Sequence, residues 1–122
     1  MPDVSRVLVV EDDADTQAAL VTLLADAGYA VTAANDGQQA LDFLMNGLRP
    51  DLMVVDLMLP NVSGSAFLHY VQTDPEHRRI PRIVLTAMPR EDVRVVADRI
   101  FYKPCDYDEL VATIRLMVPP AS

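Results

Sequence analysis

Residues 7–13 read VLVVEDD, an apolar run of four residues that stops at three carboxylates. A run this short and this rich in valine indicates a buried strand, because a core helix needs about ten residues or more. Residues 52–56 read LMVVD and repeat the pattern, with Asp56 after the apolar run. Two later apolar runs end in Thr86 and in Lys103. Acids, a hydroxyl and an amine at four strand ends predict one polar site at one edge of a sheet.

Strand and helix patterns alternate along the whole chain. We expect strands at residues 6–10, 29–33, 51–55, 82–86 and 99–102. We expect helices at residues 14–27, between Asp36-Gly37 and Asn46-Gly47, from Ser63 or Ser65 to about Gln72, at residues 90–97, and from Asp106 to Pro119. The pattern in residues 90–97 is short and weak, with Val93, Val96 and Ala97 on one helical face.

Five strand–helix units in succession predict a parallel sheet with helices on both faces, because parallel strands need crossover connections. This is the α/β class: a flavodoxin-like doubly wound (βα)5 sandwich with a five-stranded parallel sheet of order 2-1-3-4-5 and a shortened fourth helix. In such a sheet, ligands bind at the carboxyl ends of the strands where the strand order reverses, here between the first and third strands. Those strands end in Glu11-Asp12 and in Asp56.

The composition indicates one ordinary folded domain. Of the 122 residues, 51% are hydrophobic and 23% are charged, so we expect a single domain over residues 1–122 with a core at about 5–118. The net charge of −8 argues against direct nucleic-acid binding. No apolar run approaches the roughly 20 residues that span a bilayer, and no signal-peptide pattern opens the chain. The single cysteine, Cys105, fits a reducing compartment, so we expect a cytoplasmic protein without membrane contact.

The acids at the strand ends indicate a divalent cation. Like charges repel when a fold brings them together, so Glu11, Asp12 and Asp56 need a cation between them. Hard oxygen ligands suit Mg²⁺ at a phosphate site. Asp12 and Asp56 are the best direct ligands, while the longer Glu11 reaches the ion directly or through water. Asp13 stands one residue before a helix, and we expect it to cap that helix.

Asp56 also has the chemistry of a nucleophile. A carboxylate can accept a phosphoryl group to form an acyl phosphate. Thr86 would then donate a hydrogen bond to the phosphoryl oxygens, and Lys103 would supply a positive charge.

In this order, the motifs resemble the receiver domain of two-component response regulators, of the chemotaxis-response-regulator-like kind, over essentially the whole chain. The matching segments are residues 7–13, residues 51–64, Leu85-Thr86-Ala87 and Lys103-Pro104. The resemblance implies that Asp56 is the phospho-acceptor and that Asp12, with Glu11 beside it, binds Mg²⁺. It also implies that the backbone carbonyl of Met58 is a further metal ligand.

The same resemblance implies partners and a switch. The phosphohistidine of a histidine kinase, or of a phosphotransfer protein, would donate the phosphoryl group, and the signal would pass to a downstream protein or through self-association. Thr86 would move to the phosphoryl group and Lys103 would pair with it. Such a domain is a signalling module that catalyses only its own phosphorylation and dephosphorylation.

The chain departs from the family pattern after Thr86. Thr86 and Lys103 are 17 positions apart, about five fewer than is usual in the family and more than one helical turn. The family often has an aromatic residue three positions before the lysine, where this chain has Ile100. We expect Tyr102 to lie on the opposite face of its strand and to pack on a helix. In the family, this region forms the face that reports phosphorylation to partners, together with the fifth strand and the fifth helix. We therefore expect that face to be remodelled here: either its helix is cut to about two turns, or it becomes a loop.

Three other functions are compatible with parts of this sequence. A pseudo-receiver that binds partners without phosphorylation is the main alternative. An aspartate-nucleophile phosphatase would need a second acid where this chain has Met58, and a nucleotide- or flavin-binding domain would need a phosphate loop after the first strand. We expect Cys105 to be a small buried thiol, and His69 and His77 to be surface or helix residues rather than ligands.

Overall fold

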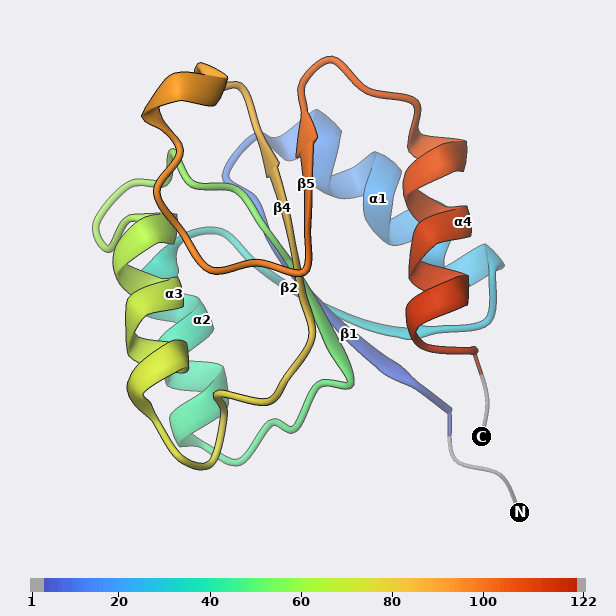
Figure 1. Cartoon of the computed structure of the whole chain (residues 1–122). Coiled ribbons are helices and arrows are strands. Elements are labelled where there is room, and N and C mark those ends of the chain that lie inside the picture. Colours follow the sequence, from blue (N-terminus) through green and yellow to red (C-terminus); the bar gives the residue numbers. More distant parts are fainter. Residues whose placement is uncertain (1–3, 121–122) are drawn as a thin grey trace.

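The computed structural model describes residues 4–120, which form a central sheet between two layers of helices (Figure 1). The strands are β1 (Arg6–Val10), β2 (Ala30–Ala34), β3 (Leu52–Val55), β4 (Arg82–Thr86) and β5 (Arg99–Tyr102). All four pairings are parallel, and the strand order is β2-β1-β3-β4-β5. The predicted strand order and fold class are confirmed.

Four α-helices cover the two faces of the sheet. They are α1 (Ala14–Asp26), α2 (Gly37–Met45), α3 (Gly64–Thr73) and α4 (Tyr107–Met117). Helices α1 and α4 lie on one face, and α2 and α3 lie on the other (Figure 1). Each helix begins after a residue whose side chain accepts a hydrogen bond from a backbone N–H of the first turn: Asp13, Asp36, Ser63 and Asp106. Such caps stabilise a helix by about 1 kcal/mol each, and the cap predicted at Asp13 is confirmed.

Strand alternation divides the core into two apolar clusters. In β1, Leu8 and Val10 pack in the cluster on the α2 and α3 side, while Val7 and Val9 pack in the cluster on the α1 and α4 side. All four side chains are at most 1% exposed. In a central strand that is buried on both faces, every side chain faces the core and is apolar. Polar residues therefore follow directly after the strand ends. This places the carboxylates of residues 11–13 at the edge of the sheet.

The short helix expected at residues 90–97 is not formed, and the connection takes the other expected form, a loop. The only regular structure between β4 and β5 is a 3-10 turn, η1 (Arg90–Asp92); the backbone of Val93 is extended, and residues 93–97 belong to neither a helix nor a strand of the sheet. Val93, Val95 and Ala97 pack against the core, whereas Val96 is 62% exposed. This is the period of two that an extended chain imposes. Three valines in four positions favour it, because β-branched side chains lose rotamer freedom in a helix.

Three smaller expectations also need correction. Tyr102 stands two residues after Ile100, so alternation puts both on the same face of β5, and the Arg90 guanidinium lies 4.3 Å from the Tyr102 ring centroid. His77 is only 3% exposed and its Nδ1 lies 2.7 Å from Asp74 Oδ2, so it is an internal residue rather than a surface one. Cys105 is half-buried rather than buried.

Within residues 4–120, none of the helices combines the length and the apolar character needed to cross a membrane.

Candidate functional site

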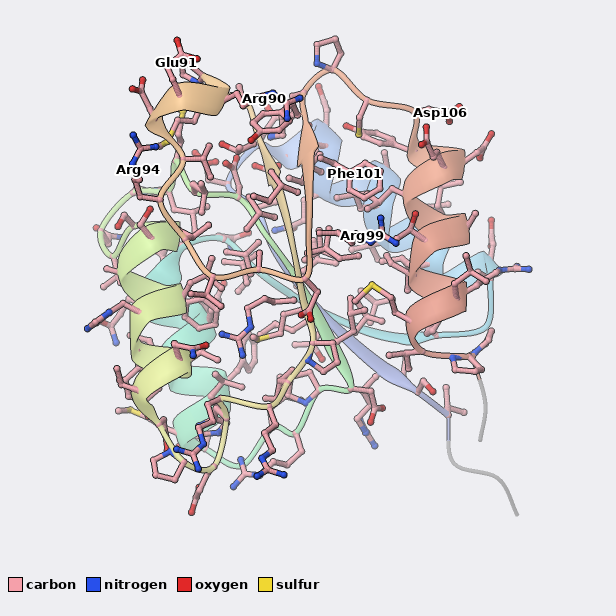
Figure 2. The ribbon with its side chains drawn as sticks, viewed as in Figure 1. Arg90, Glu91, Arg94, Arg99, Phe101 and Asp106 are labelled. Atoms are coloured by element: carbon pink, nitrogen blue, oxygen red, sulfur yellow. The ribbon has the colours of Figure 1, made fainter. Side chains whose placement is uncertain are left out.

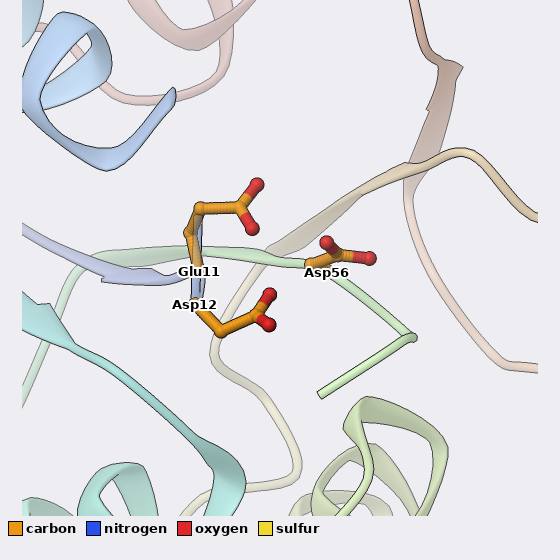
Figure 3. Close-up of side chains that lie close together, drawn as sticks. All are labelled: Glu11, Asp12 and Asp56. Carbon is orange, nitrogen blue, oxygen red and sulfur yellow. The ribbon is translucent and has the colours of Figure 1, made fainter. Parts of the chain in front are cut away.

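Three carboxylates meet where β1 and β3 end. Val10 pairs with Val55 in the parallel register, so Glu11 and Asp56 leave neighbouring strands side by side. The Asp56 N–H donates to the Val10 carbonyl at 3.0 Å. Carboxylate oxygens of Glu11, Asp12 and Asp56 lie within 4.8 Å of one another (Figure 3). Glu11 and Asp56 are buried, while Asp12 is exposed, so the cluster opens to solvent on the Asp12 side.

Lys103, the first residue after β5, reaches into this cluster. Its Nζ donates to Glu11 Oε1 at 2.6 Å and to Asp56 Oδ2 at 3.1 Å. The strand end thus brings one positive charge to two buried acids. The contact with Glu11 joins residues 92 positions apart in the chain.

Burial and the lysine act on the acids in opposite directions. Burial raises the pKa of Glu11 to about 7, and the hydrogen bond from Lys103 partly offsets this effect. Burial alone would lower the pKa of Lys103, but its hydrogen bonds to Glu11 and Asp56 outweigh burial and raise it. Lys103 is therefore charged at neutral pH, and a further cation beside Glu11 would favour the ionised form of that acid.

The donor set fits a hard divalent cation. Three carboxylates carry three negative charges when ionised and Lys103 returns one, so an excess of negative charge remains at the site. All the donors are oxygens, and one acid faces solvent, which leaves room for the water ligands that Mg²⁺ retains. The amide of Met58 donates to Asp56 Oδ1 at 3.0 Å, so residues 56–58 curl around the acid.

Thr86 lies at the same edge of the sheet but does not hydrogen-bond to the acids. It is fully buried, and its Oγ1 accepts a hydrogen bond from the Met88 N–H at 3.1 Å. Its carbonyl accepts from the Lys103 N–H at 2.8 Å, which ties the ends of β4 and β5 together. The predicted contact of Thr86 with a phosphoryl group on Asp56 stays a prediction; the hydroxyl accepts from the Met88 N–H and keeps its own hydrogen to donate.

Gly64 belongs to the site, although the sequence motifs do not assign it a role. A Cβ at this position would lie 2.0 Å from the Asp56 carbonyl oxygen and 2.6 Å from Leu57 Cα. Only glycine lets the beginning of α3 approach the acceptor strand this closely. The sequence signal was its position at the end of the matching segment, residues 51–64, which does not by itself reveal the close approach.

Comparisons with known proteins agree with this geometry. The family model described as "Response regulator receiver domain" matches residues 7–115. The chain is 39% identical over 122 residues to the transcriptional regulatory protein DltR of Streptococcus agalactiae serotype III, covering 96% of this chain and 53% of DltR. It is 42% identical over 122 residues to the sensor histidine kinase TmoS of Ectopseudomonas mendocina, covering 95% of this chain and 12% of TmoS. The chain thus spans about half or less of these two relatives.

A solved structure extends the likeness to the whole fold. The receiver domain of the sensor histidine kinase PA1611 from Pseudomonas aeruginosa PAO1 is similar at a TM-score of 0.85 and 27% identity, with 94% of this chain and 98% of that chain covered. That structure holds a magnesium ion coordinated in its active site cleft. The family model matches most of the chain, and the strand order and the acidic cluster agree with it. The chain therefore belongs to the family of response regulator receiver domains.

Proposed function

We propose that this domain accepts a phosphoryl group on Asp56 in a Mg²⁺-dependent reaction. The observation that carries the proposal is the convergence of the Glu11, Asp12 and Asp56 carboxylates with the Lys103 amine at one sheet edge. Two acids alone would have simple structural roles, such as helix caps. Three acids and a lysine, drawn from β1, β3 and β5, match the needs of phosphoryl transfer, which depends on positioning and charge stabilisation.

Each residue of the cluster has its own part in the reaction. Asp12 and Asp56 would ligate Mg²⁺ directly, Glu11 directly or through water, and the Met58 carbonyl would be a further ligand. The bound ion would neutralise charge on the transferring phosphoryl oxygens. A carboxylate oxygen of Asp56 would attack phosphorus while the bond from phosphorus to the donor nitrogen breaks. The bonding pair goes to that nitrogen, and the histidine leaves as a neutral imidazole because its other ring nitrogen carries a proton. Lys103 then exchanges its bond to Asp56 for one to the phosphoryl oxygens.

The switch would begin at Thr86. Once Asp56 carries a phosphoryl group, the Thr86 hydroxyl would donate to it and release the Met88 N–H that it now accepts from. Met88 opens the connection that contains η1 and residues 93–98. A change of one hydrogen bond at Thr86 would therefore alter the segment in which this chain departs most from the family pattern.

The partners follow from the family. We propose that the donor is the phosphohistidine of a histidine kinase or of a phosphotransfer protein in the cytoplasm, and that residues 1–122 act as a single receiver domain. The output would be a downstream protein or self-association. The match covers 53% of DltR and 12% of TmoS, so the activities of the remaining parts of those proteins are not assigned to this chain.

Intact mass spectrometry tests the proposal. The protein is incubated with Mg²⁺ and acetyl phosphate, with Asp56→Asn as the control. We expect one phosphoryl adduct on the parent chain and none on the variant. The lack of an α-helix between β4 and β5 favours one alternative, a pseudo-receiver that binds partners without phosphorylation. A parent chain that takes no adduct, although it is folded, would establish that alternative.

A further inference from the structure

Residues 93–98, here called the extended segment, alternate between half-buried and exposed side chains, and the backbone of Val93 is extended. Hydrogen bonds hold its two ends: the Val93 N–H donates to the Arg90 carbonyl at 3.3 Å, and the Asp98 N–H donates to the Arg82 carbonyl at 2.9 Å. Within residues 4–120, the main-chain groups of residues 94–97 make no hydrogen bond to another main-chain or side-chain group. Free N–H and C=O groups on an extended chain are a template for a further strand.

A groove runs between the extended segment and α3. It has a volume of about 410 Å³ and is lined by Leu68, Val95 and Val96 among others. A second hollow of about 150 Å³ lies at the far end of the segment. Gln72 and Val96 line both hollows, so the two are neighbours along the segment. One wall of the groove is α3, and the other is formed by residues 93–96. This side of α3 is open because the connection between β4 and β5 has no α-helix.

The groove is positively charged in an acidic protein. Residues 78–99 hold six of the ten Lys and Arg residues of the chain, against three acids, although the whole chain has a net charge of −8. The second hollow is also lined by Arg82, which is buried, and by Asp98, whose Oδ2 accepts from the Arg82 N–H at 2.8 Å. Arg94 lines the first hollow, and Arg78 and Arg79 line the second. All three are exposed, and within residues 4–120 none forms an ion pair with a carboxylate. Arg94 projects from the extended segment close to the beginning of α3 (Figure 2).

We propose that the groove between α3 and residues 93–98 binds an extended acidic segment of a partner protein, which adds as a strand to residues 94–97. Main-chain hydrogen bonds would supply affinity, as in other complexes formed by strand addition. Apolar side chains at alternate positions of the partner would enter the groove beside Leu68 and Val95. Acidic side chains at the other positions would meet Arg94 at one end and Arg78 and Arg79 at the other.

A second copy of this chain fits the groove poorly. Pairing of two extended segments would place one set of arginines against the other, and like charges that face each other across paired strands are destabilising. An acidic segment from another protein removes this conflict and neutralises Arg78, Arg79 and Arg94.

This inference rests on the proposed function for its biological use, because the groove would be the face that carries the output of Thr86. Binding itself is measured on the unphosphorylated protein without Mg²⁺, whereas phosphorylation is measured separately by mass. A protein that takes the phosphoryl group but does not bind the probe would overturn the groove alone. A protein that binds the probe but takes no phosphoryl group would overturn the proposed function alone.

The probe is a capped synthetic peptide of alternating glutamate and valine. We expect saturable binding, followed by amide NMR shifts, and slowed hydrogen exchange at residues 94–97. Two altered peptides test the two parts of the inference. A lysine–valine peptide reverses the charge, and a glutamate–valine peptide N-methylated at alternate residues cannot pair as a strand; neither should bind. Equal binding of either peptide, or protection confined to other residues, would refute strand addition of an acidic segment.

A charge-reversed protein locates the site. The double variant Arg79→Glu, Arg94→Glu should bind the acidic peptide at least about fivefold more weakly, since an exposed ion pair contributes up to about 1 kcal/mol. Arg115→Glu is the matched control on α4, away from the groove, and should bind as the parent does. Equal loss in the control would show non-specific attraction, and sedimentation of the free protein as a dimer with residues 94–97 protected would assign the groove to a second copy; either result refutes the proposal.

Discussion

Lys103 is the residue whose removal tests the electrostatics of the site most sharply. Its Nζ lies 2.6 Å from Glu11 Oε1 and 3.1 Å from Asp56 Oδ2, and the Glu11 side chain is only 2% exposed. In Lys103→Met, the stem is retained and the charge is lost, so the two buried acids face each other without a cation. Removing one partner of a buried ion pair costs about 3–5 kcal/mol.

We expect the loss for Lys103→Met to fall below that range. The Lys103 side chain is 20% exposed, so solvent already screens part of the interaction. Burial has also raised the pKa of Glu11 to about 7, and a proton can replace part of the lost charge. We therefore expect the free energy of unfolding at neutral pH without Mg²⁺ to fall by about 2–3 kcal/mol.

Mg²⁺ gives the second and more specific readout for this variant. The loss of one positive charge beside the acids should strengthen Mg²⁺ binding by at least about tenfold, since a unit charge a few ångströms away is worth about 1 kcal/mol in water and more in a partly buried site. Urea unfolding over a series of Mg²⁺ concentrations measures both quantities. Lys103→Arg keeps the charge and is the control. A variant that is as stable as the parent, or that binds Mg²⁺ no more tightly, would refute this account of the cluster.

Three further predictions concern the surroundings of the site. Gly64→Ala should lower the free energy of unfolding by about 1–3 kcal/mol or more, because its Cβ would lie 2.0 Å from the Asp56 carbonyl oxygen; urea unfolding should show a smaller loss for Gly47→Ala, which has positive φ but open space. Met58 offers no polar group to position water at the acceptor, so the phosphorylated protein should persist for minutes or longer with Mg²⁺, and Met58→Asn should shorten its lifetime; a parent lifetime of seconds by intact mass would contradict this reasoning. Two hydrogen bonds lower the pKa of Asp74 to about 2: the larger effect comes from the Glu76 N–H, and the next from His77. The stability that the Asp74 carboxylate contributes is complete above its ordinary pKa of 3.8, and it is lost as the pH falls through about 2. Asp74→Asn should therefore flatten the decline in unfolding free energy between these values, and an unchanged slope would count against the assignment.

The sheet and the acidic site could be predicted because strong local signals coincide there. Four apolar residues before Glu11 and four before Asp56 allow only buried strands, and the order of elements allows few topologies. Parallel strands end at one edge, so topology predicted that Lys103 and the acids share that edge, but not that Lys103 contacts Glu11.

The connection after Thr86 could not be predicted in the same way. Val93 and Ala97 fit both a helical face and an alternating strand, and the two readings differ only in whether Val95 or Val96 is buried. That choice depends on how the segment packs against the sheet and α3, which is tertiary information. The close approach of Gly64 to the acceptor strand and the burial of His77 are tertiary for the same reason.

Phosphorylation of Asp56 is the central claim, and one measurement tests it most directly. The unmodified protein is mixed with acetyl phosphate, with Mg²⁺ or with a chelator, and its intact mass is followed with Asp56→Asn and Asp12→Asn alongside. The account predicts a single adduct that forms with Mg²⁺, is absent from Asp56→Asn, and forms much more slowly in the chelator and in Asp12→Asn. An adduct that persists in Asp56→Asn, or that forms equally well in the chelator, would contradict it.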